Sequence, residues 1–168
     1  SVSLASNLGA SITTTGTAAT TITLSDTATL SAATTLTTAN TNISLEEIVG
    51  GTNDLILVAG TGAITTSAAI AGVADMTITS ASSATFAAAV ANANTVINST
   101  GTNTFDLTLA STTAVDINAG TTTFSGAVTS PLIDVAGTSS IVNIDAAPNV
   151  AKLLLTAGTV NIGVKDVD

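Results

Sequence analysis

The residues of this chain that could act together chemically are threonines, which recur at matching positions of a repeat. Thr85, Thr104 and Thr123 each precede a phenylalanine and lie nineteen residues apart, and Thr102 and Thr121 stand two residues before the last two. Because alternate residues of a strand point to the same side, each Thr-x-Thr pair would face solvent if the phenylalanines face inward. A flat array of hydroxyl groups could bind a ligand or order water, as ice-binding solenoids do.

The same threonines also have a purely structural interpretation. Thr is β-branched and suits exposed strand positions, so on a surface that is poor in charge it needs no further role. We therefore keep both interpretations of Thr85, Thr102, Thr104, Thr121 and Thr123: exposed strand residues, or a binding face.

Carboxylates are the second candidate group. Asp106 and Asp145 each follow an apolar residue that we expect to point inward, whereas Asp116 and Asp134 lie in the second predicted strand of a repeat. Calcium sites need several oxygens that converge on one point, often in the spacing D-x-[DN]-x-[DN]-G, which does not occur here. We expect solvated charges and no metal site; a calcium contact between subunits is the alternative.

The inventory of side chains argues against catalysis. The chain has no Cys and no His, and its only basic residues are Lys152 and Lys165. Catalysis at neutral pH usually recruits His, Cys, Lys, Tyr or a perturbed carboxylate. We expect no enzyme, no catalytic residue and no cofactor; a β-helical polysaccharide lyase or hydrolase is the enzyme alternative, and it would need basic residues or paired carboxylates in a groove.

Charge and hydropathy argue against two classes of partner, nucleic acids and the membrane interior. The net charge is −9 from eleven carboxylates and two lysines, so the chain lacks the basic residues that neutralise nucleic-acid phosphates. Thr, Ser, Asn and Gly interrupt every apolar run, and none approaches the ~18–20 residues of a membrane span. We expect no nucleic-acid binding and no membrane insertion.

A repeat of about twenty residues dominates the chain. Phe86, Phe105 and Phe124 are its only phenylalanines, and Ile144 and Ile162 occupy the same position in the two following units. Such a period is typical of a coiled array in which each unit contacts its neighbours.

Alternation of apolar and small residues predicts the strands of each unit. Phe105, Leu107 and Leu109 form one alternating series, which predicts a strand with all three side chains on its buried face. A second apolar pair follows about ten residues later, as in Val115 and Ile117. We therefore predict that each unit consists of a strand, a corner, a second strand and a corner that contains glycine.

A junction of the form G-T-x-x-(Phe/Ile/Leu) separates the units. It begins at residues 51, 60, 101, 120, 137 and 158. Glycine suits a corner, and β-branched Thr then starts an extended run. We predict an all-β chain that forms a parallel β-helix with coils of ~19 residues.

Residues 51–168 carry this pattern, and residues 1–50 follow it poorly. We expect 51–168 to form regular solenoid coils and 1–50 to form an irregular N-terminal cap or preceding coils. Because the chain begins with Ser1, we expect a processed protein or an excised fragment.

The segments VDINAGTTTF at 115–124 and LLLTAGTVNI at 153–162 carry a resemblance to known families. They resemble the degenerate repeats of bacterial autotransporter passenger domains and filamentous-haemagglutinin-type adhesins. The composition, rich in Thr, Ala, Ser and Val and free of Cys, is also similar to that of surface-layer proteins. The resemblance implies a right-handed parallel β-helix, exported and displayed at the cell surface.

These observations lead to two functional hypotheses. The first is a structural or adhesive protein of a bacterial surface: a β-solenoid rod that assembles into a layer or filament or forms the stalk of an adhesin. Its partners would be further copies, other surface proteins or a host-cell ligand, and its location extracellular, which the lack of Cys also fits. The second is a ligand- or ice-binding solenoid that uses the threonine ladder.

Overall fold

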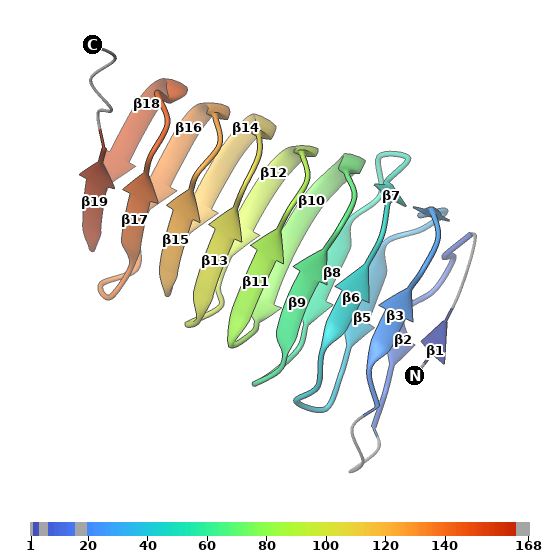
Figure 1. The fold of residues 1–168 in the computed structure, drawn as a ribbon. Coiled ribbons are helices and arrows are strands. Elements are labelled where there is room, and N and C mark those ends of the chain that lie inside the picture. The colour runs from blue at the N-terminus through green and yellow to red at the C-terminus, as the bar shows by residue number, and fades with distance from the viewer. Residues whose placement is uncertain (1, 4–6, 16–19, 164–168) are drawn as a thin grey trace.

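The chain folds into a solenoid of parallel strands with no helix among the described residues. The computed structural model describes residues 2–3, 7–15 and 20–163. Two parallel sheets face each other along the whole rod, and the chain alternates between them (Figure 1). The predicted parallel β-helix is therefore confirmed. No helix in the described ranges is long and apolar enough to cross a membrane.

The front sheet, which faces the reader in Figure 1, contains nine short strands. Their order in the sheet is their order along the chain: β1 (Val2–Ser3), β3 (Ile22–Leu24), β6 (Ile43–Leu45), β9 (Ala63–Thr66), β11 (Ser83–Phe86), β13 (Thr102–Phe105), β15 (Thr121–Phe124), β17 (Ile141–Ile144) and β19 (Thr159–Ile162).

The back sheet contains ten strands and is less regular. Its main path is β2 (Ile12–Thr13), β5 (Thr34–Thr37), β8 (Leu55–Val58), β10 (Ile70–Ser80), β12 (Val90–Ile97), β14 (Leu109–Ile117), β16 (Val128–Val135) and β18 (Asn149–Leu155). The short strands β4 (Ala28–Thr29) and β7 (Ile48–Val49) pair with each other, and β7 also pairs with β10. The back strands run opposite to the front strands, and the path over the top of the rod makes the coil right-handed (Figure 1).

Strand register stacks equivalent residues on successive turns. Each front strand pairs in parallel with the next, and the step between partners varies from 18 residues at Ile144 and Ile162 to 21 at Leu45 and Thr66. We call such a row of register partners a column. Strands β3 and β6, from the first fifty residues, continue the same columns into β9.

The phenylalanines occupy one inward column of the front sheet. Phe86, Phe105 and Phe124 are fully buried, and their rings stack with centroids 4.6 and 5.4 Å apart. The whole column consists of Leu24, Leu45, Thr66, Phe86, Phe105, Phe124, Ile144 and Ile162. Opposite it, the back sheet contributes an aliphatic column: Ile12, Leu36, Leu57, Ile78, Ile97, Ile117, Val135 and Leu155.

The prediction that Phe105, Leu107 and Leu109 lie on one strand is wrong. Strand β13 ends at Phe105, and β14 begins at Leu109 in the other sheet. Leu107 lies in the turn between them and is 53% exposed. Alternation of apolar residues continued by chance across a corner, where the chain leaves one sheet for the other.

The long back strands bend, and buried polar groups stabilise the bends. Register shifts mark the bend, for example between Asn92 and Asn94. Asn92 donates to Thr95 Oγ1 at 2.8 Å and accepts from Ser111 Oγ at 2.8 Å, and all three side chains are buried. At the bend, Asn92 Nδ2 also donates to the backbone carbonyl oxygen of Asn94 at 2.9 Å, so a side chain supplies a hydrogen bond to the backbone where the register shifts.

Glycine is required at the corner before β15. Gly120 has φ of +71°, and a Cβ there would lie 2.4 Å from the carbonyl oxygen of Gly101 in the turn below. A side chain is disfavoured both by the backbone conformation and by the close stacking of corners. This explains the glycine of the G-T junction at this position.

We predict that Thr66→Val stabilises the protein. Thr66 is buried in the phenylalanine column, and its Oγ1 has no hydrogen-bond partner. Val replaces the hydroxyl by a methyl group of similar size, so the free energy of unfolding should rise by about 1 kcal/mol. Urea denaturation would measure the change. The control is Thr95→Val, which removes a buried hydroxyl that is hydrogen-bonded and should lower stability by about 1 kcal/mol; equal losses in both variants would contradict the prediction.

We predict that Phe105→Ala causes a large loss of stability. Its ring contacts both neighbouring rings, so truncation leaves a cavity in the middle of the stack and should lower the free energy of unfolding by about 3–5 kcal/mol. Phe105→Leu keeps most of the apolar volume and should lose clearly less. Thermal or urea unfolding followed by circular dichroism would compare the two, and a loss below about 1 kcal/mol for Phe105→Ala would contradict the stacked core.

Candidate functional site

The predicted threonines lie together on the outer surface of the front sheet. Thr85, Thr104 and Thr123 are register partners, and Thr102 and Thr121 are partners in a second outward column. All five side chains are partly or well exposed, while the residue between each pair points inward. We call these two outward columns the hydroxyl face.

The hydroxyl face extends beyond the residues that the sequence suggested. One column consists of Thr23, Ser44, Thr65, Thr85, Thr104, Thr123, Asn143 and Asn161. The other consists of Ala63, Ser83, Thr102, Thr121, Ile141 and Thr159. Sequence reasoning missed Thr23, Ser44 and Thr65 because they precede Leu, Leu and Thr in place of Phe. Their positions before the inward column were the signal that could have found them.

Most hydroxyl groups of this face have no protein partner. Among the described residues, the side-chain hydroxyls of Thr85, Thr102, Thr104 and Thr121 make no hydrogen bond, whereas Thr123 Oγ1 accepts from Asn143 Nδ2 at 3.3 Å. Asn161 continues that contact by donating to Asn143 Oδ1 at 2.9 Å. The free hydroxyls are therefore concentrated on β11, β13 and β15.

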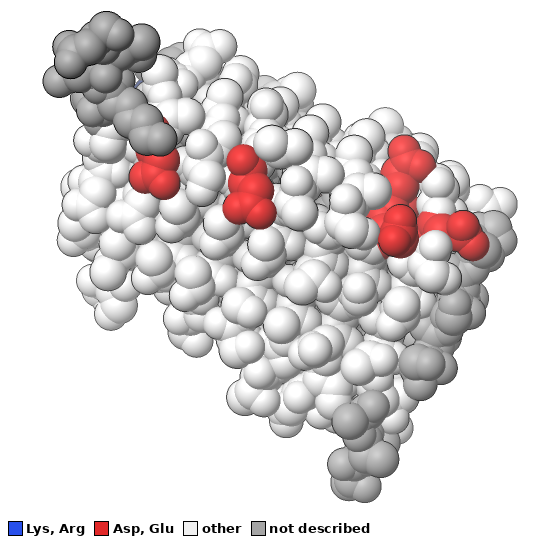
Figure 2. All heavy atoms as spheres, viewed as in Figure 1, with Lys and Arg blue, Asp and Glu red and all other residues white. Residues whose placement is uncertain are grey.

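The two columns of the hydroxyl face contain no charged residue, and the nearest carboxylates lie in turns. Asp106 and Asp145, like Asp26, Glu46 and Glu47, occupy turns that follow the front strands. In Figure 2 the acidic side chains on this side lie near the ends of the front strands, and the surface over the strands is uncharged. Asp106 and Asp145 belong to turns separated by another turn, at Ser125, so the structure does not bring them together.

The back sheet brings two other predicted carboxylates together. Asp116 and Asp134 are register partners on adjacent strands and point outward. Partial burial raises the pKa of Asp116, and the negative charges of Asp134 and Asp75 raise it further, while a hydrogen bond from the Asn94 side chain lowers it in part. Asp134 Oδ1 is inaccessible to solvent and has no partner. The pair thus concentrates negative charge that the surroundings only partly compensate.

In the described ranges, no three His, Cys, Asp or Glu side chains are placed to hold a metal ion. Lys152 lies on β18 and is exposed, and Lys165 falls outside the described residues.

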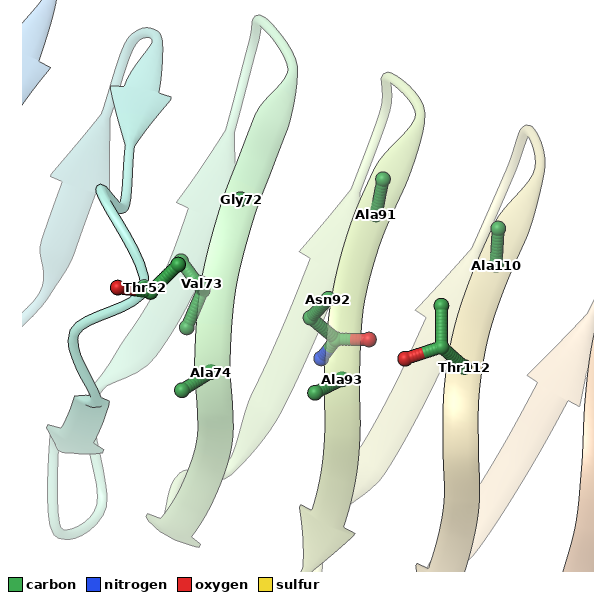
Figure 3. A pocket seen from close by; sticks show the side chains of 9 residues that line it. All are labelled: Thr52, Gly72, Val73, Ala74, Ala91, Asn92, Ala93, Ala110 and Thr112. Carbon is green, nitrogen blue, oxygen red and sulfur yellow. The ribbon is translucent and has the colours of Figure 1, made fainter.

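A shallow groove crosses the bends of the back sheet. It has a volume of about 400 Å³ and is lined by Thr52, Gly72, Val73, Ala74, Ala91, Asn92, Ala93, Ala110 and Thr112. Figure 3 shows these small side chains on β10, β12 and β14 and on the loop before β8. Asn92, its buried amide, is hydrogen-bonded to Thr95 and Ser111 and so has no free group for a ligand. The sequence analysis missed this groove, although Ala71, Ala91 and Ala110 recur at the period of the repeat.

Comparison with known proteins finds no relative of this chain. No family model, no curated protein and no solved structure matches the chain.

We predict that Asp116→Asn stabilises the protein at neutral pH. The folded state raises the pKa of Asp116 above its ordinary value of 3.8, so the folded state binds this proton more tightly than the unfolded state. The stability that Asp116 contributes is therefore complete below about pH 3.8 and is lost as pH rises through the raised pKa. The advantage of Asp116→Asn should be present at neutral pH and disappear on acidification, as measured by urea unfolding.

Asp106→Asn is the control for that measurement, because it removes one negative charge from an exposed turn away from Asp134. If both variants shifted stability equally at every pH, the raised pKa of Asp116, which comes from its partial burial and from the charges of Asp134 and Asp75, would be ruled out as the cause.

Proposed function

We propose that this protein is a non-enzymatic structural rod of a bacterial cell surface, which assembles end to end into a filament or layer or forms the stalk of an adhesin. The resemblance of its G-T repeats to autotransporter and filamentous-haemagglutinin passenger domains supports the location. The composition supports the lack of catalysis, because Cys and His are absent.

The observation that carries the proposal is the apolar surface of the last described turn. Leu153, Leu155 and Ile162 belong to inward columns but are 40%, 51% and 51% exposed. On the turn before, their partners Ile133, Val135 and Ile144 are at most 1% exposed. A further turn of parallel strands on β18 and β19 would bury these side chains and pair the free strand edges.

Residues that follow in a longer chain would supply such a turn, as would a second copy of this chain stacked head to tail; we propose that a second copy stacks on this turn. Such a contact joins two different surfaces and therefore propagates into a filament.

We predict that Leu155→Glu weakens self-association. An unpaired charge buried in the contact should raise Kd by more than about tenfold, since a factor of ten needs only ~1.4 kcal/mol. Sedimentation velocity over a range of concentrations would show larger species for the wild type and a shift to monomer for the variant.

Leu107→Glu is the matched control, because Leu107 is 53% exposed but lies on the side of the rod. It should associate like the wild type. A wild-type chain that stays monomeric at all concentrations, or equal losses in both variants, would refute head-to-tail assembly.

A second candidate function is a binding face on the side of the rod. The observation that favours it is the hydroxyl face, where free threonine hydroxyls of β11, β13 and β15 stand in register in columns that contain no charged residue. The two functions are compatible, because one uses the end of the rod and the other uses its side.

A further inference from the structure

The hydroxyl face is more regular than the rest of the surface. The parallel pairs that join β9, β11, β13, β15, β17 and β19 contain no register shift. Shifts occur in the back sheet, where β10 pairs with β8 and β12 and where β14 pairs with β12 and β16. The front sheet therefore presents its outward side chains on a two-dimensional grid that continues over the full length of these strands.

The outer surfaces of the two sheets differ in composition at comparable exposure. The corresponding outward column of the back sheet reads Thr35, Ile56, Thr77, Val96, Asp116, Asp134 and Leu154. That column mixes hydroxyl, apolar and charged residues at comparable exposure. If Thr were present only because it suits exposed strands, both outer surfaces should be equally rich in it.

The grid has two fixed repeats. Neighbouring turns are ~4.8 Å apart, and outward residues along a strand are about 6.6 Å apart, as strand geometry requires. A surface that repeats in two directions can contact a crystalline lattice at several turns at once.

Threonine also has suitable chemistry for such a surface. Its hydroxyl donates one hydrogen bond and accepts up to two, so it can bond to lattice waters of either orientation, and its β-branch restricts the side chain to few rotamers. The hydroxyls of Thr85, Thr102, Thr104 and Thr121 make no bond to described residues, so they are available to water. A charged group would impose its own hydration shell, and neither column contains one.

From these observations we propose that the hydroxyl face binds ice, with Thr102, Thr104, Thr121 and Thr123 at the centre of the contact. This inference rests on the second function proposed above, the binding face, and is independent of head-to-tail assembly. The ligand is the ordered surface of ice, and recognition comes from the match between two lattices.

Thr104→Lys tests the proposal, with the full chain as the reference. The wild type should show thermal hysteresis and be incorporated into a slowly growing ice hemisphere. Thr104→Lys places a charged, longer side chain in the middle of the face and should lose most of both activities. Thr77→Lys is the matched control, since Thr77 is a partly exposed strand residue of the back sheet, and it should keep wild-type activity.

Circular dichroism and thermal melting would verify that both variants fold. If Thr104→Lys does not fold, Thr102→Lys replaces it, because Thr102 is more exposed and belongs to the other column of the same face. Exclusion of the wild type from ice, equal activity of the two Lys variants, or binding to crystalline cellulose or chitin without binding to ice would overturn the proposal. Because Leu155→Glu tests assembly separately, failure here leaves that proposal unaffected.

Discussion

Every feature of this rod depends on parallel backbone pairing between turns in one fixed register. Each front strand from β3 to β17 hydrogen-bonds to the strand one turn earlier and the strand one turn later, so a side chain stacks on its equivalent 18 to 21 residues away. A one-residue slip would exchange the inward and outward sets of a strand, which would expose the phenylalanines and bury the threonines. Register and the alternation of side chains therefore stabilise each other along the whole coil.

The narrow interior makes the rod sensitive to single polar atoms. Most inward columns are aliphatic or aromatic, and the phenylalanine rings stack in the middle turns. In the bend of the back strands, the buried polar side chains of Asn92, Thr95 and Ser111 bond one another. On the straight front strands, Asn103 Nδ2 and Thr122 Oγ1 are buried without a partner, and Thr66 interrupts the phenylalanine column without a partner for its hydroxyl. The repeat thus has a polar residue, Thr66, at a position of the inward column where a polar residue lowers stability.

The two outer surfaces have different physical characters because the sheets have different geometry. The front strands are short and straight and carry a neutral grid of hydroxyl groups. The back strands bend, and their outer column includes the carboxylates of Asp116 and Asp134 on adjacent turns. The last described turn forms a third kind of surface, where residues of inward columns such as Leu155 are exposed. Side and end can therefore serve separate interactions without competing.

The sequence by itself determined the solenoid and the orientation of its most regular columns. The reason is that residues one repeat apart in a parallel coil lie on top of one another. Phe86, Phe105 and Phe124 identified the core column, and the residues before them identified the hydroxyl face. The sequence did not reveal that Leu107 lies outside the buried columns, because the same alternation of apolar and polar residues occurs within a strand and across a corner. Only the tertiary structure determined the bend of the back strands, the pairing of Asp116 with Asp134 and the exposure of Leu155. All three features depend on which residues of the neighbouring turns lie beside a given side chain. The path of the whole coil determines those neighbours, and a short stretch of sequence does not.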